Sequence, residues 1–226
     1  MKDLVRARIR EAVFGTQDGL ISTLGALTGI AEGTQDRQAV VIAGFVIIVV
    51  ESLSMAAGSY LSSKSNRQYL EHLIREEREL IRTDPEGERR EVRQMYRARG
   101  YKEEEIDMIE KRLFSNPHLL LEDMAHKELG ITPQSMEDPV GNALIMGTAY
   151  VAGGLVPVLP YWFTGIPLAM PVSIGVAFTA LFWVGAVKGR FVRQSPWRSG
   201  LEMVAVAGVA ALAGWLIGRL ASQWVG

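Results

Sequence analysis

Cysteine is absent from the 226 residues, which excludes disulfides, thiolate metal sites and cysteine nucleophiles. Histidine is scarce, and all three copies lie between residues 72 and 126, outside every long apolar stretch. A serine hydrolase with an intramembrane histidine base is therefore not supported. The sequence also lacks a Glu-x-x-His motif and a Walker A loop, so neither a ferritin-like di-iron centre nor ATP hydrolysis is indicated.

Charge is missing from most of the chain. Residues 64–139 hold 18 of the 25 acidic and 14 of the 24 basic residues. The net charge of −1 therefore combines one highly charged segment with apolar segments that carry few charges. The charged segment is not net basic and has few aromatics, which argues against nucleic-acid binding. The rest is apolar enough to enter a lipid bilayer, where a helical span needs about 20 mostly apolar residues.

Five apolar segments are expected to cross the membrane as helices. They cover residues 13–32, 39–63, 140–163, 166–187 and 200–219. The expected fold is an all-α membrane protein with five transmembrane helices and a cytoplasmic helical insert between the second and the third. Its expected parts are an amphipathic helix at the membrane surface (1–12), transmembrane helices 1 and 2 (13–63), the insert (64–139) and transmembrane helices 3–5 (140–226).

Basic residues alternate between the loops that join these segments. Lys and Arg are frequent before the first segment, in the insert and around residues 188–198, and sparse elsewhere. Because Lys and Arg mark cytoplasmic loops, we expect the N-terminus and the insert inside and the C-terminus outside. Without cysteine or a targeting extension, the expected location is the plasma membrane of a prokaryotic cell.

Proline and glycine residues divide the insert into short helices. Residues 64–82 continue the second span, and further helices are expected over 86–99, 102–114 and 118–129. Gly100 is expected to end the first of these three, and Gly130 is expected just beyond the last, in the position that favours glycine.

Glycine recurs every four residues in two of the spans. Gly25, Gly29 and Gly33 do so in the first, and Gly214 and Gly218 do so in the fifth. Small residues at this spacing let helix backbones approach closely in lipid. The pattern therefore predicts close helix packing, either within the chain or across a dimer seam.

Two apolar spans each carry one carboxylate and no internal cation. Asp18 lies in the first, and Glu51 lies in the second with Met55 one helical turn later. A charge at the bilayer centre costs on the order of 2.5–3.5 kcal/mol, so such residues are functional candidates. Either the acids are neutral and hydrogen-bonded, or they meet a cation on a polar path. A carboxylate beside a thioether indicates a divalent transition metal.

The insert carries a second set of candidate ligands at helical spacing. The pairs are Glu76 with Glu79, Glu88 with Glu91, and Met124 with Glu128. A bound cation would relieve the repulsion between like charges one turn apart. Interleaved arginines equally fit an ordinary solvated face. Glu77 is expected to be plain surface charge.

Three motifs together carry a family likeness. "DGLISTLGALTGIA", "SMAAGSYLSSKS" and the acidic insert ending in "MAHKELGI" resemble the vacuolar iron transporter (Ccc1-like) family over about residues 12–220. The resemblance implies a homodimer with five spans and a cytoplasmic metal-binding domain. It implies export of Fe²⁺, and often Mn²⁺, from the cytosol in exchange for protons.

The resemblance also implies roles for individual residues. Asp18 and Met55 match pathway positions, and the insert ligands it implies are Glu76, Glu79, Glu88, Glu91, Met124 and Glu128. Ile47 occupies the family's pathway glutamate position, so Glu51, one turn later, is expected to substitute for it. The gap between the two glutamate pairs leaves Glu79 and Glu77 as alternatives.

The function expected from the sequence is a Fe²⁺/proton exchanger, not an enzyme. No permanently bound cofactor is expected, and Mn²⁺, Zn²⁺ or Co²⁺ are further candidate ions. The expected partners are a second copy of the chain, the lipid bilayer, divalent metal ions and protons. The alternative is a membrane-anchored metal sensor or store that does not transport.

Overall fold

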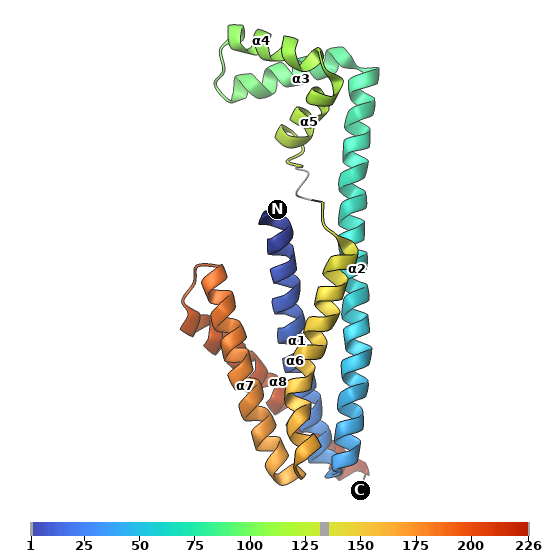
Figure 1. The fold of residues 1–226 in the computed structure, drawn as a ribbon, viewed down its shortest axis with the longest axis vertical. Helices are drawn as coiled ribbons and strands as arrows, with labels where there is room; N and C mark the ends of the chain where they lie inside the picture. The colour runs from blue at the N-terminus through green and yellow to red at the C-terminus, as the bar shows by residue number, and fades with distance from the viewer. Residues whose placement is uncertain (1, 132–135, 226) are drawn as a thin grey trace. The chain divides into compact units, whose positions relative to one another are not determined.

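The computed structural model describes residues 2–131 and 136–225, and its regular elements within these ranges are eight helices and no strands (Figure 1). The helices are α1 (Lys2–Thr34), α2 (Arg37–Thr83), α3 (Pro85–Ala98), α4 (Glu103–Phe114), α5 (Pro117–Lys127), α6 (Pro139–Phe163), α7 (Ile166–Phe191) and α8 (Pro196–Val225). The prediction of an all-α protein is confirmed.

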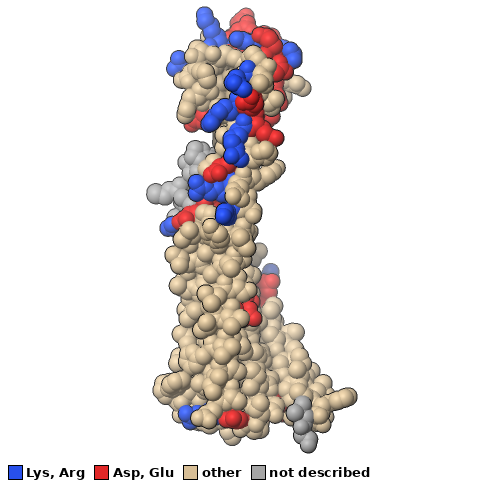
Figure 2. All heavy atoms as spheres, turned by 90° about the vertical axis from the view of Figure 1, so that its right-hand side faces the viewer, with Lys and Arg blue, Asp and Glu red and all other residues tan. Residues whose placement is uncertain are grey.

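The chain divides into two compact units. The insert unit comprises Met1–Leu4 and Ser62–Asp138, and the span unit comprises Val5–Leu61 and Pro139–Gly226. α2 belongs to both, since its apolar first half lies in the span unit and its charged second half in the insert unit. Acidic and basic side chains gather over the insert unit, whereas the visible face of the apolar helices carries few (Figure 2).

Four helices of the described chain are long and apolar enough to cross a membrane, namely α2, α6, α7 and α8. They contain the second to fifth predicted spans. α1 contains the first predicted span but does not reach the same hydropathy, because glycine and threonine dilute it. The count of five spans therefore stays a prediction. α1 is also continuous through residue 12, so a separate surface helix over 1–12 stays a prediction as well.

α1 is an interior helix of the span unit. Leu20 and Leu24 are at most 1% exposed and pack with residues of α7 and α8, such as Leu181 and Ala207. Further along α1, Leu27 is fully buried in a second cluster with residues of α2, α6 and α7. A helix that contacts protein on most sides needs less apolar surface than one that faces lipid, which accounts for its lower hydropathy.

The repeated glycines lie where helix backbones touch. A Cβ built on Gly15 would lie 2.6 Å from the carbonyl oxygen of Met146 in α6. A Cβ on Gly29 would lie 2.7 Å from the carbonyl oxygen of Gly214 in α8. Close packing is therefore confirmed, and it occurs within the chain. A dimer seam receives no support from this stripe, because α8 of the same chain already covers it.

Gly29→Ala is expected to destabilise the protein relative to Gly58→Ala. Both variants gain the same helix propensity, but only the first forces a methyl group against the α8 backbone, since nothing lies within 4 Å of Gly58. The expected difference is about 1–3 kcal/mol in the free energy of unfolding. Thermal unfolding of the detergent-solubilised variants measures it, and equal midpoints would contradict the packing.

Local signals set the helix ends of the insert unit. Asp84 caps α3 by accepting a hydrogen bond from the Gly87 amide at 2.9 Å, and Asn116 caps α5 in the same way. Gly100 and Gly130 adopt positive φ angles of 87° and 66°, as expected for glycines that end helices. The amphipathic faces of α3, α4 and α5 meet in one apolar core that includes Val92.

Candidate functional sites

The two carboxylates of the first two predicted spans, Asp18 and Glu51, lie on neighbouring antiparallel helices. Ser59 of α2 donates a hydrogen bond of 2.8 Å to Glu11 of α1, which sets the register between them. Asp18 lies two turns after Glu11, and Glu51 lies two turns before Ser59, so both fall at a similar depth. Asp18 and Glu51 are close enough to interact electrostatically. The structure therefore brings these two predicted site residues together.

α6 adds polar groups beside this pair. The Tyr150 side chain is fully buried, and its hydroxyl lies 2.6 Å from Ser22 Oγ of α1. The Tyr150 hydroxyl lies near enough to Asp18 and Glu51 to feel the charge of either carboxylate. Three helices thus contribute oxygen atoms to one region of the apolar span unit, and a path for a cation or a proton requires such groups.

The site residues of α2, Glu51 and Met55, differ in their exposure. Glu51 is exposed on α2, between Val50 (58% exposed) and Leu53 (66% exposed). Met55 is partly buried one turn later. A carboxylate on a face that is otherwise apolar needs a polar or protein neighbour in the membrane, because lipid tails offer none.

Glu11 belongs to the same face of α1 but was not singled out from the sequence. It is 6% exposed, accepts from Ser59 and forms an ion pair of 3.1 Å with Arg10. Its spacing of seven residues from Asp18 was a usable signal, since i and i+7 share a helix face. The basic residues around it suggested a surface helix instead.

The insert unit contains a second carboxylate site, the four-glutamate cluster of Glu77, Glu88, Glu91 and Glu128. Glu77 comes from α2, the next two from α3, and the last follows α5. The carboxyl of Glu77 is close enough to Glu88, Glu91 and Glu128 for their charges to act on it, and the carboxyl of Glu128 is likewise close to Glu91. Glu77 and Glu88 are 4% exposed, whereas Glu91 and Glu128 face solvent. The cluster is therefore closed at one end and open at the other.

Burial and mutual repulsion keep protons on this cluster. Burial of the Glu77 carboxyl, followed by the charges of Glu128 and Glu88, raises its pKa to about 8. Partial desolvation of the Glu128 carboxyl, followed by the charge of Glu91, raises its pKa to about 7. Burial likewise raises the pKa of Glu88. A cation would replace these protons and relieve the repulsion.

Two oxygens of the cluster, Glu77 Oε1 and Glu88 Oε2, are buried without a hydrogen-bond partner among the described residues. Buried acceptors without partners are costly, and a cation would satisfy them. Across residues 2–131 and 136–225, however, no three His, Asp or Glu side chains converge closely enough to hold an ion. Metal binding by the cluster therefore requires side-chain rotation, which the exposed Glu91 and Glu128 permit.

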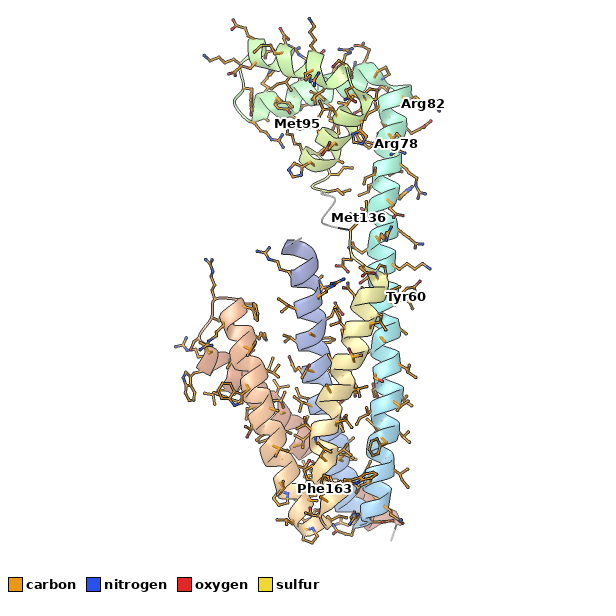
Figure 3. All side chains as sticks on the ribbon, viewed as in Figure 1. Tyr60, Arg78, Arg82, Met95, Met136 and Phe163 are labelled. Atoms are coloured by element: carbon orange, nitrogen blue, oxygen red, sulfur yellow. The ribbon has the colours of Figure 1, made fainter. Side chains whose placement is uncertain are left out.

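The other predicted insert ligands lie elsewhere. Glu76 is exposed and lies 3.4 Å from His72, and Glu79 is exposed and pairs with Arg82 at 2.6 Å. Arg82 projects from the last turn of α2 (Figure 3). Met124 is fully buried in the apolar core of the insert unit. The expectation that Glu77 is surface charge was wrong, because the core-facing side of α2 carries it inward.

The insert unit is expected to lose stability as pH rises from about 4.5 to about 8 when metal is chelated. Glu77 binds its proton more tightly when folded, since its pKa is about 8 against a reference of 4.5. The folded state therefore holds more protons in this window, and the free energy of unfolding falls with pH. Hydrogen exchange of α3 amides in EDTA, corrected for intrinsic rates, measures this.

Glu77→Gln should flatten this pH dependence, whereas Glu79→Gln should leave it unchanged. Hydrogen bonds from Arg93 lower the pKa of Glu110, which acts in the opposite direction but only below about pH 4.5. A flat profile for the unmodified chain between about pH 5 and pH 8 would contradict the protonated cluster.

Comparison with known proteins identifies the family. The model of the VIT family matches residues 9–219. The chain belongs to the VIT family. Vacuolar iron transporter 2 of Oryza sativa subsp. japonica is 32% identical over 208 residues, which cover 91% of this chain and 84% of the relative. Protein CCC1 of Saccharomyces cerevisiae is 28% identical over 221 residues, which cover 94% of this chain and 68% of the relative.

Vacuolar iron transporter 1 of Arabidopsis thaliana is a further relative of this VIT-family chain. It is 29% identical over 215 residues, which cover 94% of this chain and 85% of the relative. The resemblance noted from the sequence is thus confirmed. The Oryza and Arabidopsis relatives are named as vacuolar iron transporters, so the family is one of transporters rather than enzymes.

Proposed function

We propose that this chain transports Fe²⁺, and also Mn²⁺, out of the cytosol in exchange for protons. The relatives named as vacuolar iron transporters support metal transport. The observation that carries the proposal is that Asp18 of α1 and Glu51 of α2 lie at a similar depth of the span unit, in the register that the Ser59–Glu11 hydrogen bond sets. Each acid costs on the order of 2.5–3.5 kcal/mol at the bilayer centre if charged, and a simple anchor would need neither.

Proton coupling follows from the chemistry of the proposed ligands. A carboxylate must be ionised to bind a metal and becomes protonated most easily when empty. Asp18 and Glu51 would therefore hold either Fe²⁺ or protons, so that metal moves one way and protons the other. Met55 contributes a thioether, which favours transition metals over calcium and magnesium. Zn²⁺ and Co²⁺ fit the same donors.

The four-glutamate cluster is the proposed collecting site for the cargo ion. Its two buried oxygens without partners, Glu77 Oε1 and Glu88 Oε2, favour a cation. Glu91 and Glu128 would admit the ion from solvent. Roles for Glu76, Glu79 and Met124 as additional ligands stay predictions.

A homodimer with cytoplasmic N-termini is part of the proposal. Glu51 is exposed on an apolar face of α2, and a second copy of the chain would shield it from lipid. The concentration of Lys and Arg before α1, in the insert and after α7 supports a cytoplasmic side there. Placement in a plasma membrane stays a prediction, since the plant relatives are named as vacuolar.

Metal flux into proteoliposomes tests the function. Reduced Fe²⁺ and Mn²⁺ are each supplied outside, and a pH dye reports the lumen. The expected result is uptake of both ions with opposing proton movement. The alternative, an anchored metal sensor or store, predicts that the full chain binds Mn²⁺ but moves neither ion. Uptake without any proton movement would retain transport and reject exchange.

A further inference from the structure

A groove at one end of the span unit plays no part in the proposed pathway. It has a volume of about 590 Å³ and lies between the start of α1 and the end of α7. Both ends lie at the same end of the span unit (Figure 1). Its lining includes three cations and three apolar side chains, namely Arg6, Arg10, Lys188, Phe14, Phe191 and Val192.

The lining combines a large apolar surface with cations. Phe14 is 51% exposed, Phe191 62% and Val192 53%, so apolar side chains stay open to the surroundings. Arg6, Arg10 and Lys188 are the charged residues of the lining, and all three are basic. Glu11, which is not a lining residue, pairs with Arg10 at 3.1 Å, and the charged residues of the lining itself are all positive.

An exposed apolar face of α7 continues from the groove residue Phe191 toward the membrane interior. Val187 and Trp183, one and two turns before Phe191, are 47% and 65% exposed. The cations lie at the end of the same helices, where basic residues are concentrated and a bilayer presents its headgroups. A ligand that fits must therefore carry a negative headgroup and a long apolar chain, in that order along α7.

We propose that this groove binds an anionic phospholipid. The phosphate lies between the cations of α1 and α7, and an acyl chain follows Phe191, Val187 and Trp183. Basic pockets between transmembrane helices suit acidic headgroups, and each Lys or Arg near a membrane surface adds attraction. A free nucleotide or phosphate would leave the exposed aromatic and aliphatic side chains unused.

Native mass spectrometry of the full chain in detergent tests the proposal. Phosphatidylglycerol and phosphatidylcholine with identical acyl chains are added separately, and inorganic phosphate is added as a competitor. Phosphatidylglycerol should bind more tightly than phosphatidylcholine and resist displacement by phosphate. Arg10→Gln with Lys188→Gln should weaken phosphatidylglycerol binding by about 25-fold, from about fivefold for each cation.

The matched control is Arg8→Gln with Arg190→Gln, which removes the same charge from the same two helices outside the groove. This control should retain the preference for phosphatidylglycerol. Lys188→Gln alone is expected to weaken phosphatidylglycerol binding about fivefold. This single variant replaces the double variant if the latter does not fold. Equal binding of the two lipids, displacement by phosphate, or an equal loss in the control would each overturn the proposal.

Discussion

Asp18→Asn and Glu51→Gln are each expected to reduce metal flux into proteoliposomes by more than about 100-fold. Changes to residues that merely support a metal ligand cost about 10–100-fold, and these variants would remove a charged ligand itself. Both substitutions keep the size of the side chain, so helix packing should survive. Flux of Mn²⁺, measured with a fluorescent indicator inside the vesicles, is the readout, with the pH dye recording proton movement.

The control for this pair is Glu202→Gln. Glu202 is an exposed carboxylate on α8 and lies outside the α1–α2 pair. The Glu202→Gln variant should transport metal at the rate of the unmodified chain. Retention of full flux in both Asp18→Asn and Glu51→Gln would reject the pathway, whereas loss in all three variants would point to a general effect of charge.

Glu77→Gln is expected to weaken metal binding at the insert by at least about 10-fold, while Glu79→Gln changes it by less than about twofold. Glu77 is buried in the four-glutamate cluster, whereas Glu79 is exposed and paired with Arg82. The measurement is a Mn²⁺ titration followed by electron paramagnetic resonance on the full chain. Asp18→Asn and Glu51→Gln in the background remove the proposed membrane site from the signal.

This comparison decides between the two registers that the sequence leaves open. Weaker Mn²⁺ binding in Glu79→Gln, with unchanged binding in Glu77→Gln, would show that α2 presents a different face to the metal. Glu86→Gln, which changes an exposed acid of α3, provides a further control for surface charge. Binding that survives in every single variant would reject the cluster as the collecting site.

Metal binding by the insert should also depend on pH, because protons on the four-glutamate cluster compete with the metal. At about pH 6 the carboxyls of Glu77 and Glu128, with pKa values of about 8 and about 7, are mostly protonated. Metal must displace these protons, so the affinity of the insert for Mn²⁺ should rise between about pH 6 and about pH 8. Constant affinity over this interval would contradict proton release on binding.

Local sequence determined the helices and their ends. Apolar stretches of span length and the helix-ending glycines Gly100 and Gly130 all act within a few residues of where they stand. The helices expected in the insert agree with α3, α4 and α5 to within about two residues at most ends, the usual accuracy of such boundaries. The glycine spacing likewise predicted close packing, because a stripe of small residues has few other uses in lipid.

Only the tertiary structure decided which residues meet. Glu76, Glu77 and Glu79 are near neighbours in the sequence, and a rotation of one residue moves a side chain by about 100° around a helix. Ile81 of α2 packs on the apolar core of the insert unit, and Glu77, one turn earlier on the same side, is buried while Glu76 and Glu79 are exposed. The contact between Glu11 and Ser59 depends on residues 48 apart in the chain. Local pattern cannot specify such contacts, because they form only when helices dock.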